Sequence, residues 1–380
     1  MKKMRLLTPG PTTIPEQVLS KFAEPVIHHR TALFEEIFKQ LQSQLRWLFQ
    51  TEQPVLSLAC TGTGAMEATV VNLFSPSDEV ITVNAGKFGE RWTKICKTYG
   101  LTVHELMVER GKSVELAALT ALLDAHPHVK AVLFQASETS TGALMPVEAI
   151  VTHCKKRNVL SVCDGITAVG IFNLPMDRWG IDVLITGSQK ALMLPPGLAF
   201  IALSERAWKL AEQSQLPKFY FDLKRERKMQ DKLQTAWTPA ISLIQGAVVA
   251  LKMLQDRGHE AAFKHHECLA HATRSAAKAL GLEFFASSPS PVLTTVKVPP
   301  QILEGKKIVK RMLEKYGVII TGGQDELEGK ILRLSHFGYT DIFDVVTGIA
   351  ALEMALLELG YPVELGKGVG AAQKAFQEFK

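Results

Sequence analysis

Short apolar runs alternate with helical stretches through the first half of the chain, and this rhythm restricts the possible folds more than any other feature. Each run is bounded by polar turns and is too short for a core helix, as expected for strands buried on both faces. The runs are Val55–Leu58, Val80–Val83, Thr102–Leu106, Val132–Phe134, Leu160–Cys163, Val183–Thr186 and Leu198–Leu203. Strands interleaved with helices in this way predict an α/β fold with a mainly parallel, doubly wound sheet.

The chain is longer than one ordinary hydrophobic core supports, since it has 380 residues, so we expect two domains. Residues 1–15 contain three prolines and no helical pattern, which predicts an extended N-terminal arm. Residues 16–257 are predicted to form a large domain, with a first long helix over Phe34–Phe49. Residues 258–380 show helix, strand, helix, strand and helix signals, which predict a smaller C-terminal α+β domain.

The composition excludes several classes of protein. With 47% hydrophobic and 21% charged residues the chain is globular, and its net charge of +5 is spread without a basic run that would indicate nucleic-acid binding. No segment has the length and apolar character of a membrane span or a signal peptide. The five cysteines form no CxxC pair and no zinc spacing, so we expect a reduced, cytoplasmic setting. The pairs His28–His29 and His265–His266 also lack ligand spacing, so we expect them at the surface and expect no metal site.

Two polar residues follow neighbouring strands of the predicted sheet. Asp164 comes directly after Leu160–Cys163, and Lys190 lies in the polar turn after Val183–Thr186. Ligands of open α/β sheets bind at the carboxyl ends of the strands. There, a lysine that forms a Schiff base and an aspartate that keeps a pyridinium nitrogen protonated fit a pyridoxal 5'-phosphate (PLP) site. Each residue alone is more simply a surface lysine or a helix cap, but the pair favours the cofactor.

A small polar turn joins the strand Val55–Leu58 to the next helix and contains Thr61, Gly62 and Thr63. Backbone N–H groups at a helix N-terminus bind phosphate, and Gln189 beside the lysine adds a neutral donor. The same turn is equally well explained as a strand–helix connection with a threonine N-cap.

Three further side chains fit a ligand site or an ordinary structural role. Phe88 is flanked by glycines after a strand, so it either lies flat on a planar ligand or belongs to the core. Thr139 follows the strand Val132–Phe134, where its hydroxyl either bonds the phenolic oxygen of the cofactor or caps a helix. Arg333 stands alone in an apolar strand and needs an anion, either a structural carboxylate or the α-carboxylate of an amino-acid substrate.

The ordered set of segments resembles the class V aminotransferases of fold type I. The closest branch contains the serine/alanine–glyoxylate (serine–pyruvate) aminotransferases, some of whose members are labelled soluble hydrogenase small subunit. The resemblance runs over nearly the whole chain and rests on Thr8–Thr12, Ile27–Arg30, Gly62–Ala68, Gly86–Arg91, Glu138–Gly142, Gly187–Lys190, Trp237–Leu243 and Arg333–Ser335.

The resemblance implies a role for each residue around a PLP ring. Lys190 would form the Schiff base and carry the proton, and Asp164 would pair with the pyridine nitrogen. Phe88 would stack on one face of the ring with Ile166 under the other, and Thr139 would bond the phenolic oxygen.

The resemblance also implies a phosphate site completed by a second subunit of a homodimer. Its own-chain residues would be Thr61, Gly62, Thr63 and Gln189, and Thr238 would come from the partner. Relatives often read Thr-Pro-Tyr-Thr-Pro where this chain has Thr235–Pro239, so the Thr238 contact departs from the pattern. Ala168 stands where relatives often have serine, which removes one hydroxyl.

The resemblance implies an aminotransferase that passes an amino group from alanine or serine to glyoxylate or pyruvate by a ping-pong mechanism. Arg333 would bind the substrate α-carboxylate. The sequence offers no clear second arginine for a distal carboxylate, because Arg30 and Arg91 lie in segments with other structural duties. Small neutral substrates are therefore expected.

Two alternatives remain open at this stage. A cysteine desulfurase or selenocysteine lyase of the same fold typically stacks a histidine on the ring, has another before the lysine, and uses a mobile cysteine. Here the corresponding residues are Phe88 and Gln189, and Cys268 lies in a helical stretch. The second alternative is a non-catalytic hydrogenase partner, for which the chain offers no iron–sulfur or nickel ligand set.

Overall fold

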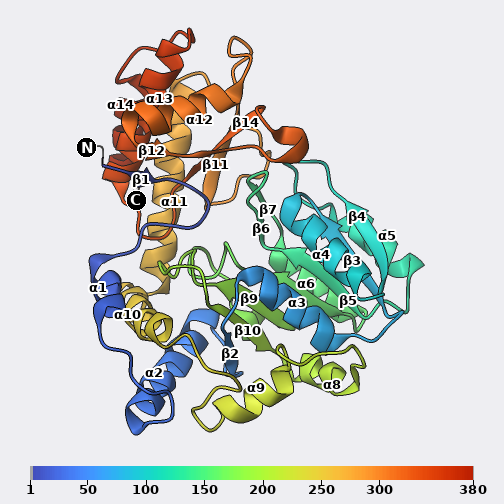
Figure 1. Ribbon diagram of the computed structural model, residues 1–380. Coiled ribbons are helices and arrows are strands. Elements are labelled where there is room, and N and C mark those ends of the chain that lie inside the picture. The colour runs from blue at the N-terminus through green and yellow to red at the C-terminus, as the bar shows by residue number, and fades with distance from the viewer. Residues whose placement is uncertain (1–2, 380) are drawn as a thin grey trace.

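A central sheet of seven strands organises the computed structural model, which describes residues 3–379 (Figure 1). The strand order is β2 (Val55–Leu58), β10 (Ala199–Leu203), β9 (Val183–Gly187), β8 (Leu160–Asp164), β5 (Ala131–Gln135), β3 (Glu79–Asn84) and β4 (Thr102–Met107). All seven predicted runs are strands of this sheet. Six of them run in the same direction, and β10 runs in the opposite direction. The predicted α/β fold with a mainly parallel, doubly wound sheet is confirmed.

Helices cover both faces of the sheet, which is why the strands in its middle are buried and mostly apolar. In β5, Val132 and Phe134 enter one hydrophobic core, whereas Ala131 and Leu133 enter the other, because successive side chains of a strand point to opposite faces. The first face is covered by α2 (Ala32–Phe49), α5 (Leu116–Ala125), α6 (Val147–Lys156) and α10 (Ile241–Arg257). The second is covered by α3 (Gly62–Leu73), α4 (Lys87–Thr98) and α8 (Glu205–Gln213).

Short elements connect these layers. They are α1 (Glu16–Leu19), η1 (Ser20–Ala23), β6 (Ser137–Glu138), β7 (Ala143–Leu144), α7 (Met176–Trp179) and α9 (Leu223–Gln230). Among them, α9 begins after an Asp222 N-cap whose carboxylate accepts two backbone N–H groups.

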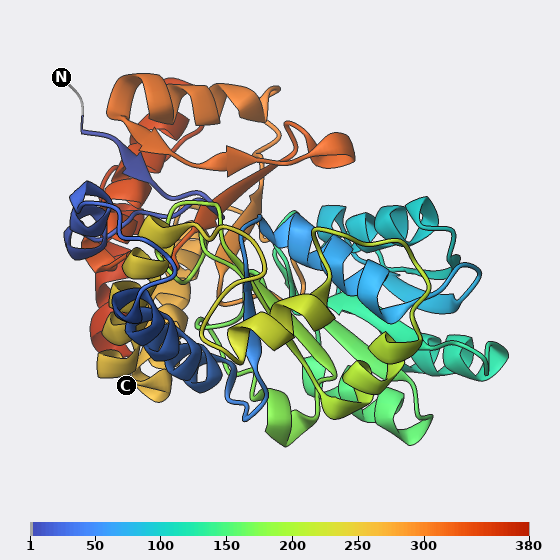
Figure 2. The same cartoon turned by 60° about the horizontal axis from the view of Figure 1, so that its bottom comes forward.

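The C-terminal part forms a separate layer beside the sheet, coloured orange to red in Figures 1 and 2. Its elements are α11 (His259–Ala279), β11 (Leu293–Lys297), α12 (Gly305–Tyr316), β12 (Val318–Ile319), β13 (Thr321–Gly322), η2 (Asp325–Leu327), β14 (Ile331–Ser335), α13 (Ile342–Glu358) and α14 (Lys367–Glu378). The two short strands β12 and β13 are separate because they pair with different strands, β12 with β1 and β13 with β14.

The N-terminal arm packs against this C-terminal layer. Its strand β1 (Arg5–Leu6) pairs with β12, and Leu7 joins the C-terminal hydrophobic core. Met1, Lys2 and Lys380, which the predicted arm and C-terminal domain include, lie outside the described residues. The boundary predicted after residue 257 falls at Gly258, between α10 and α11, and stays a prediction. No helix within residues 3–379 has the length and apolar character needed to cross a membrane.

Candidate active site

Lys190 and Asp164 lie at the same edge of the sheet because their strands are parallel neighbours. Asp164 ends β8 and is in register with Ile185 of β9, and Lys190 lies in the turn that follows β9. Both side chains are buried, with 8% of Lys190 and 5% of Asp164 exposed. The structure therefore brings together the two residues on which the predicted cofactor site depends.

The N-terminal arm holds the lysine in place. The Lys190 ammonium donates a hydrogen bond to the carbonyl of Pro9 at 2.5 Å, and the Thr12 hydroxyl donates to the Lys190 carbonyl at 3.0 Å. Gly10 has φ +109°, and a Cβ there would lie 2.3 Å from the lysine Nζ. This position therefore requires glycine, both for its backbone conformation and for the close approach of the lysine.

Burial moves the pKa values of the two catalytic candidates toward neutrality. It raises the pKa of Asp164 to about 6, and the neighbouring Glu138 carboxylate adds to this rise. The Ile166 N–H, which donates to the Asp164 carboxylate at 2.8 Å, opposes it. Burial also lowers the pKa of Lys190 to about 8, although Asp164 works in the other direction. A lysine in this range can both release and accept a proton near neutral pH.

The turn predicted to bind phosphate is close to the residues around Asp164. A Cβ on Gly62 would lie 2.4 Å from Ile166 Cδ1, so glycine lets the first turn of α3 approach this side chain. Thr61 occupies the N-cap position without forming a side-chain capping bond, and its side chain is exposed together with that of Thr63. The free N–H groups and hydroxyls of this helix end suit an anion. Beside them, the Gln189 side-chain oxygen is buried and has no partner among the described residues.

A buried carboxylate that the sequence reasoning passed over joins two of the predicted site segments. Glu138 accepts hydrogen bonds from the N–H groups of Phe88 (3.2 Å) and Gly89 (3.0 Å), and from the N–H and hydroxyl of Ser140. Its side chain is fully buried, and burial raises its pKa while these bonds lower it. Glu138 therefore fixes both the start of α4, which carries Phe88, and the turn that carries Thr139.

Arg333 reaches the same turn from β14. Its guanidinium donates to the carbonyls of Gly322 at 2.7 Å and Thr139 at 2.9 Å, and the side chain is 5% exposed. Burial lowers the pKa of Arg333 to about 10, with Glu138 acting in the other direction. Within residues 3–379 it forms no salt bridge, so its positive charge is not matched by a structural carboxylate at contact distance. A guanidinium in this state favours binding of an anionic ligand.

Arg91 contacts a residue of the turn that is predicted to bind phosphate. It donates to the Thr63 hydroxyl at 3.1 Å and lies over the Phe88 ring, 4.9 Å from the ring centre. These contacts agree with the structural duty expected for Arg91, although its charge also acts on Asp164 and Lys190.

One predicted cofactor residue stands apart from this group. Thr238 is exposed, and its segment is held by the Trp237 indole, which donates to the carbonyl of Tyr220 at 2.8 Å. Its phosphate contact stays a prediction. At the position that departs from the family pattern, Ala168 is fully buried, and the preceding Thr167 hydroxyl donates to the Ser137 carbonyl at 3.3 Å.

Two expectations about other reactive side chains have different outcomes. The expectation that His265 and His266 lie at the surface is wrong for His266, which is 2% exposed within α11 and accepts a bond from the Gly338 N–H. Cys268 lies in the same helix, as expected, with 8% of its side chain exposed and a pKa raised by burial. It therefore lacks the mobile setting of a desulfurase cysteine.

Comparison with known proteins gives a consistent result. The family model described as class-V aminotransferase matches residues 5–339. A soluble hydrogenase small subunit of Synechococcus sp. is 41% identical over 98% of both chains. A serine–glyoxylate aminotransferase of Arabidopsis thaliana is 33% identical, covering 98% of this chain and 95% of the relative. An L-aspartate–glyoxylate aminotransferase of Paracoccus denitrificans is 32% identical, covering 98% and 96%.

Among solved structures, the ureidoglycine–glyoxylate aminotransferase of Bacillus subtilis matches with a TM-score of 0.94 at 28% identity. The match covers 100% of this chain and 99% of the other.

Proposed function

The chain belongs to the class V aminotransferases, and we propose that it transfers the amino group of alanine or serine to glyoxylate or pyruvate. PLP is the cofactor of this family, so the protein is a PLP-dependent transaminase. Family membership supports a catalytic protein over the alternative of a non-catalytic hydrogenase partner. The choice of donor and acceptor is the part that we propose.

The residues at the sheet edge fit PLP and divide its binding between them. The anion-binding end of α3, with Thr61, Gly62 and Thr63, would hold the phosphate together with Gln189. Asp164 would supply the negative charge that keeps a ring nitrogen protonated. The predicted ring contacts of Phe88 and Ile166, and the bond from Thr139, complete the proposed set.

The chemistry depends on a proton that Lys190 would take from the substrate Cα, hold on its amine and then release. When bound, PLP withdraws electrons from the substrate Cα and so makes its proton removable. Lys190, with a pKa lowered to about 8, is suited to accept this proton and to release it again. The Pro9 carbonyl, which accepts from the Lys190 ammonium, limits where the amine can move, and the Thr12 hydroxyl holds the backbone of the same residue. Because one pocket serves both amino acids in turn, we propose ping-pong kinetics.

The observation that carries the substrate proposal is the buried Arg333, which has two backbone carbonyl partners and no carboxylate partner among residues 3–379. A planar guanidinium binds a carboxylate with two parallel hydrogen bonds. Arg91 is already occupied by Thr63 and Phe88. The site therefore offers one strong carboxylate position, which suits amino acids with small neutral side chains.

A second candidate donor is aspartate, which the name of the Paracoccus relative includes. It would need a second cation near the ring, and Arg91 is the residue whose charge already acts on both Asp164 and Lys190. Without a cation, burying the distal carboxylate would cost roughly a few kcal/mol.

A panel of amino donors against glyoxylate, read as kcat/KM, tests the proposal. We expect alanine or serine to exceed aspartate and glutamate by about tenfold or more, since each 1.4 kcal/mol corresponds to a factor of ten. Arg333→Ala should reduce kcat/KM for every donor by about ten- to a hundredfold, as for the loss of a charged hydrogen-bond pair. Arg311→Ala, which removes a surface partner of Glu358, is the matched control. Aspartate as the best donor, with a loss confined to Arg91→Ala, would replace our proposal by the second candidate.

We also propose that the protein is a homodimer. Large apolar side chains are exposed on the N-terminal helices and near α9, with Leu33 at 59% and Phe219 at 74%. Thr238 lies exposed in the segment that follows α9. A partner that covered this surface would shield these side chains and bring Thr238 to a second phosphate site.

A further inference from the structure

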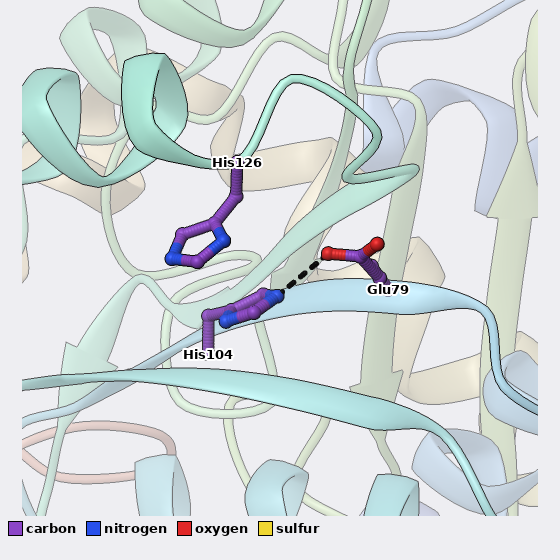
Figure 3. Close-up of side chains that lie close together, drawn as sticks. All are labelled: Glu79, His104 and His126. Carbon is purple, nitrogen blue, oxygen red and sulfur yellow. Dashed lines mark hydrogen bonds and ion pairs between the residues drawn. The ribbon is translucent and has the colours of Figure 1, made fainter.

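Three side chains of metal-binding type, one carboxylate and two imidazoles, lie close together (Figure 3). Glu79 begins β3, His104 lies in the edge strand β4, and His126 caps the C-terminus of α5. One donor atom from each lies within 4.8 Å of the other two, and all three side chains are half-buried. The active site uses the carboxyl ends of the strands, whereas Glu79 marks the amino end of β3.

The contacts within this group leave its donor atoms close together. His104 Nε2 lies 2.8 Å from a Glu79 carboxylate oxygen. The His104 and His126 rings stack with their centres 3.5 Å apart and their planes inclined by 21°. Lys130, whose backbone N–H donates to the Glu79 carbonyl, directs its ammonium to Asp78 at 2.7 Å and so leaves the Glu79 carboxylate to His104 and a ligand.

We propose that Glu79, His104 and His126 form a binding site for a divalent transition-metal ion, with Zn²⁺ as the representative ligand. Two imidazoles and one carboxylate are a common protein ligand set for Zn²⁺, and three such ligands leave a fourth position for water. The ligands come from three different elements, so no short sequence motif contains them. For this reason our reading of the sequence predicted no metal site.

Binding requires one adjustment of the observed geometry. Zn²⁺ holds imidazole nitrogen at about 2.0–2.1 Å and carboxylate oxygen at about 2.0–2.2 Å in a tetrahedral arrangement. Two stacked rings cannot both direct a lone pair at one ion, so one ring has to turn. His126 is suited to this, because it follows the last turn of α5 and precedes the exposed Pro127. Its backbone stays anchored by the bond from its N–H to the Leu122 carbonyl.

The bound ion would join the edge of the sheet to the helix above it. β4 is the last strand of the sheet and has only β3 as a neighbour. An ion shared by β3, β4 and the end of α5 would stabilise the native state by mass action, because the unfolded chain lacks this arrangement. We therefore expect Zn²⁺ binding to raise the melting temperature. Removal of the ion from this site should leave transamination unchanged.

The test uses the PLP-loaded protein, freed of metals with a chelator and titrated with Zn²⁺ by calorimetry and by thermal unfolding. We expect the wild type to bind one Zn²⁺ per chain. The dissociation constant should rise by about tenfold or more in His126→Ala and in Glu79→Gln. His128→Ala is the matched control, because this neighbouring histidine is exposed and lies outside the group; it should bind as the wild type does. Substitution of Co²⁺ should give the visible absorption of a tetrahedral site in the wild type and in His128→Ala only.

Two results would overturn the proposal. One is the absence of saturable Zn²⁺ binding to the wild-type protein, which would leave the group as a hydrogen-bonded His104–Glu79 pair with a stacked ring. The other is equal Zn²⁺ affinity in the wild type and His126→Ala, which would place the bound ion at other histidines. Retained PLP absorbance and circular dichroism would show that the variants are folded.

Discussion

Asp164→Asn should make the protein less active but, without its cofactor, more stable at alkaline pH. The carboxylate is 5% exposed, and burial raises its pKa from 3.8 to about 6. The folded state therefore binds this proton more tightly than the unfolded state does. A shift of roughly two units at about 1.4 kcal/mol each corresponds to about 3 kcal/mol.

The direction of this pH dependence follows from the proton affinities of Asp164 in the folded and unfolded states. Below the unfolded pKa of 3.8 both states are protonated, and Asp164 carries no electrostatic penalty. As the pH rises toward about 6, the unfolded state loses the proton first, so the free energy of unfolding falls. Above that value the full penalty of about 3 kcal/mol persists. Asparagine does not titrate, and its side-chain oxygen can still accept the Ile166 N–H, so the variant should lack this pH dependence.

The assay is urea unfolding of the PLP-free protein at about pH 4 and about pH 8. Relative to the wild type, Asp164→Asn should gain about 2 to 3 kcal/mol between the two values. Asp124→Asn is the matched control and should show almost no change between these two pH values. Asp124 is exposed and its pKa is lowered by a hydrogen bond from Arg157, so its contribution to stability varies mainly below about pH 4. An Asp164→Asn curve parallel to the wild-type curve would refute the buried-charge reasoning. Transamination by the PLP-loaded variant should fall sharply, because the ring nitrogen loses its counter-charge.

Three further predictions concern the lysine, the arm and the assembly. Lys190→Ala should abolish steady-state transamination, and borohydride reduction of the wild type followed by peptide mapping should label Lys190; a label on another lysine would contradict its role. Gly10→Ala should cost about 1–2 kcal/mol of stability for its positive φ alone, and it should also lower kcat, because the added Cβ overlaps Lys190 Nζ. Gly360→Ala, at an open positive-φ site, is the control that has the backbone strain without this overlap. Equal kcat in both variants would contradict an effect of the overlap on Lys190. Light scattering during assay should show a dimer, whereas a fully active monomer at high dilution would exclude a site shared between subunits.

The sequence was sufficient to predict the residues whose position follows from the sheet. Asp164 and Lys190 come after adjacent parallel strands, so their meeting at one edge follows from strand order and the side on which ligands bind. Arg333 was predictable as a residue that needs an anion, because a charge in an apolar strand is costly. These inferences need only local patterns and one rule of topology.

Other parts of the site depend on contacts that local patterns do not contain. The Pro9 carbonyl that accepts from Lys190 lies 181 positions away in the chain, and nothing near either residue indicates the pairing. Glu138 follows a strand in a polar segment, which is equally typical of an exposed turn, and only the structure shows its four buried donors. The surface position expected for His266 was wrong because α11 buries that face against the rest of the molecule.

The predicted site contains three buried charged side chains that have no oppositely charged side chain in contact among the described residues. Arg333, Lys190 and Asp164 are all buried, and within residues 3–379 none of them forms a salt bridge. Burial accordingly lowers the pKa of Arg333 to about 10 and of Lys190 to about 8, and raises that of Asp164 to about 6. Each shift reflects the cost of burying a charge without an oppositely charged group at contact distance. The substrate carboxylate and the cofactor ring nitrogen would supply the missing counter-charges, so the free energy stored in these residues becomes available for binding when the ligands arrive.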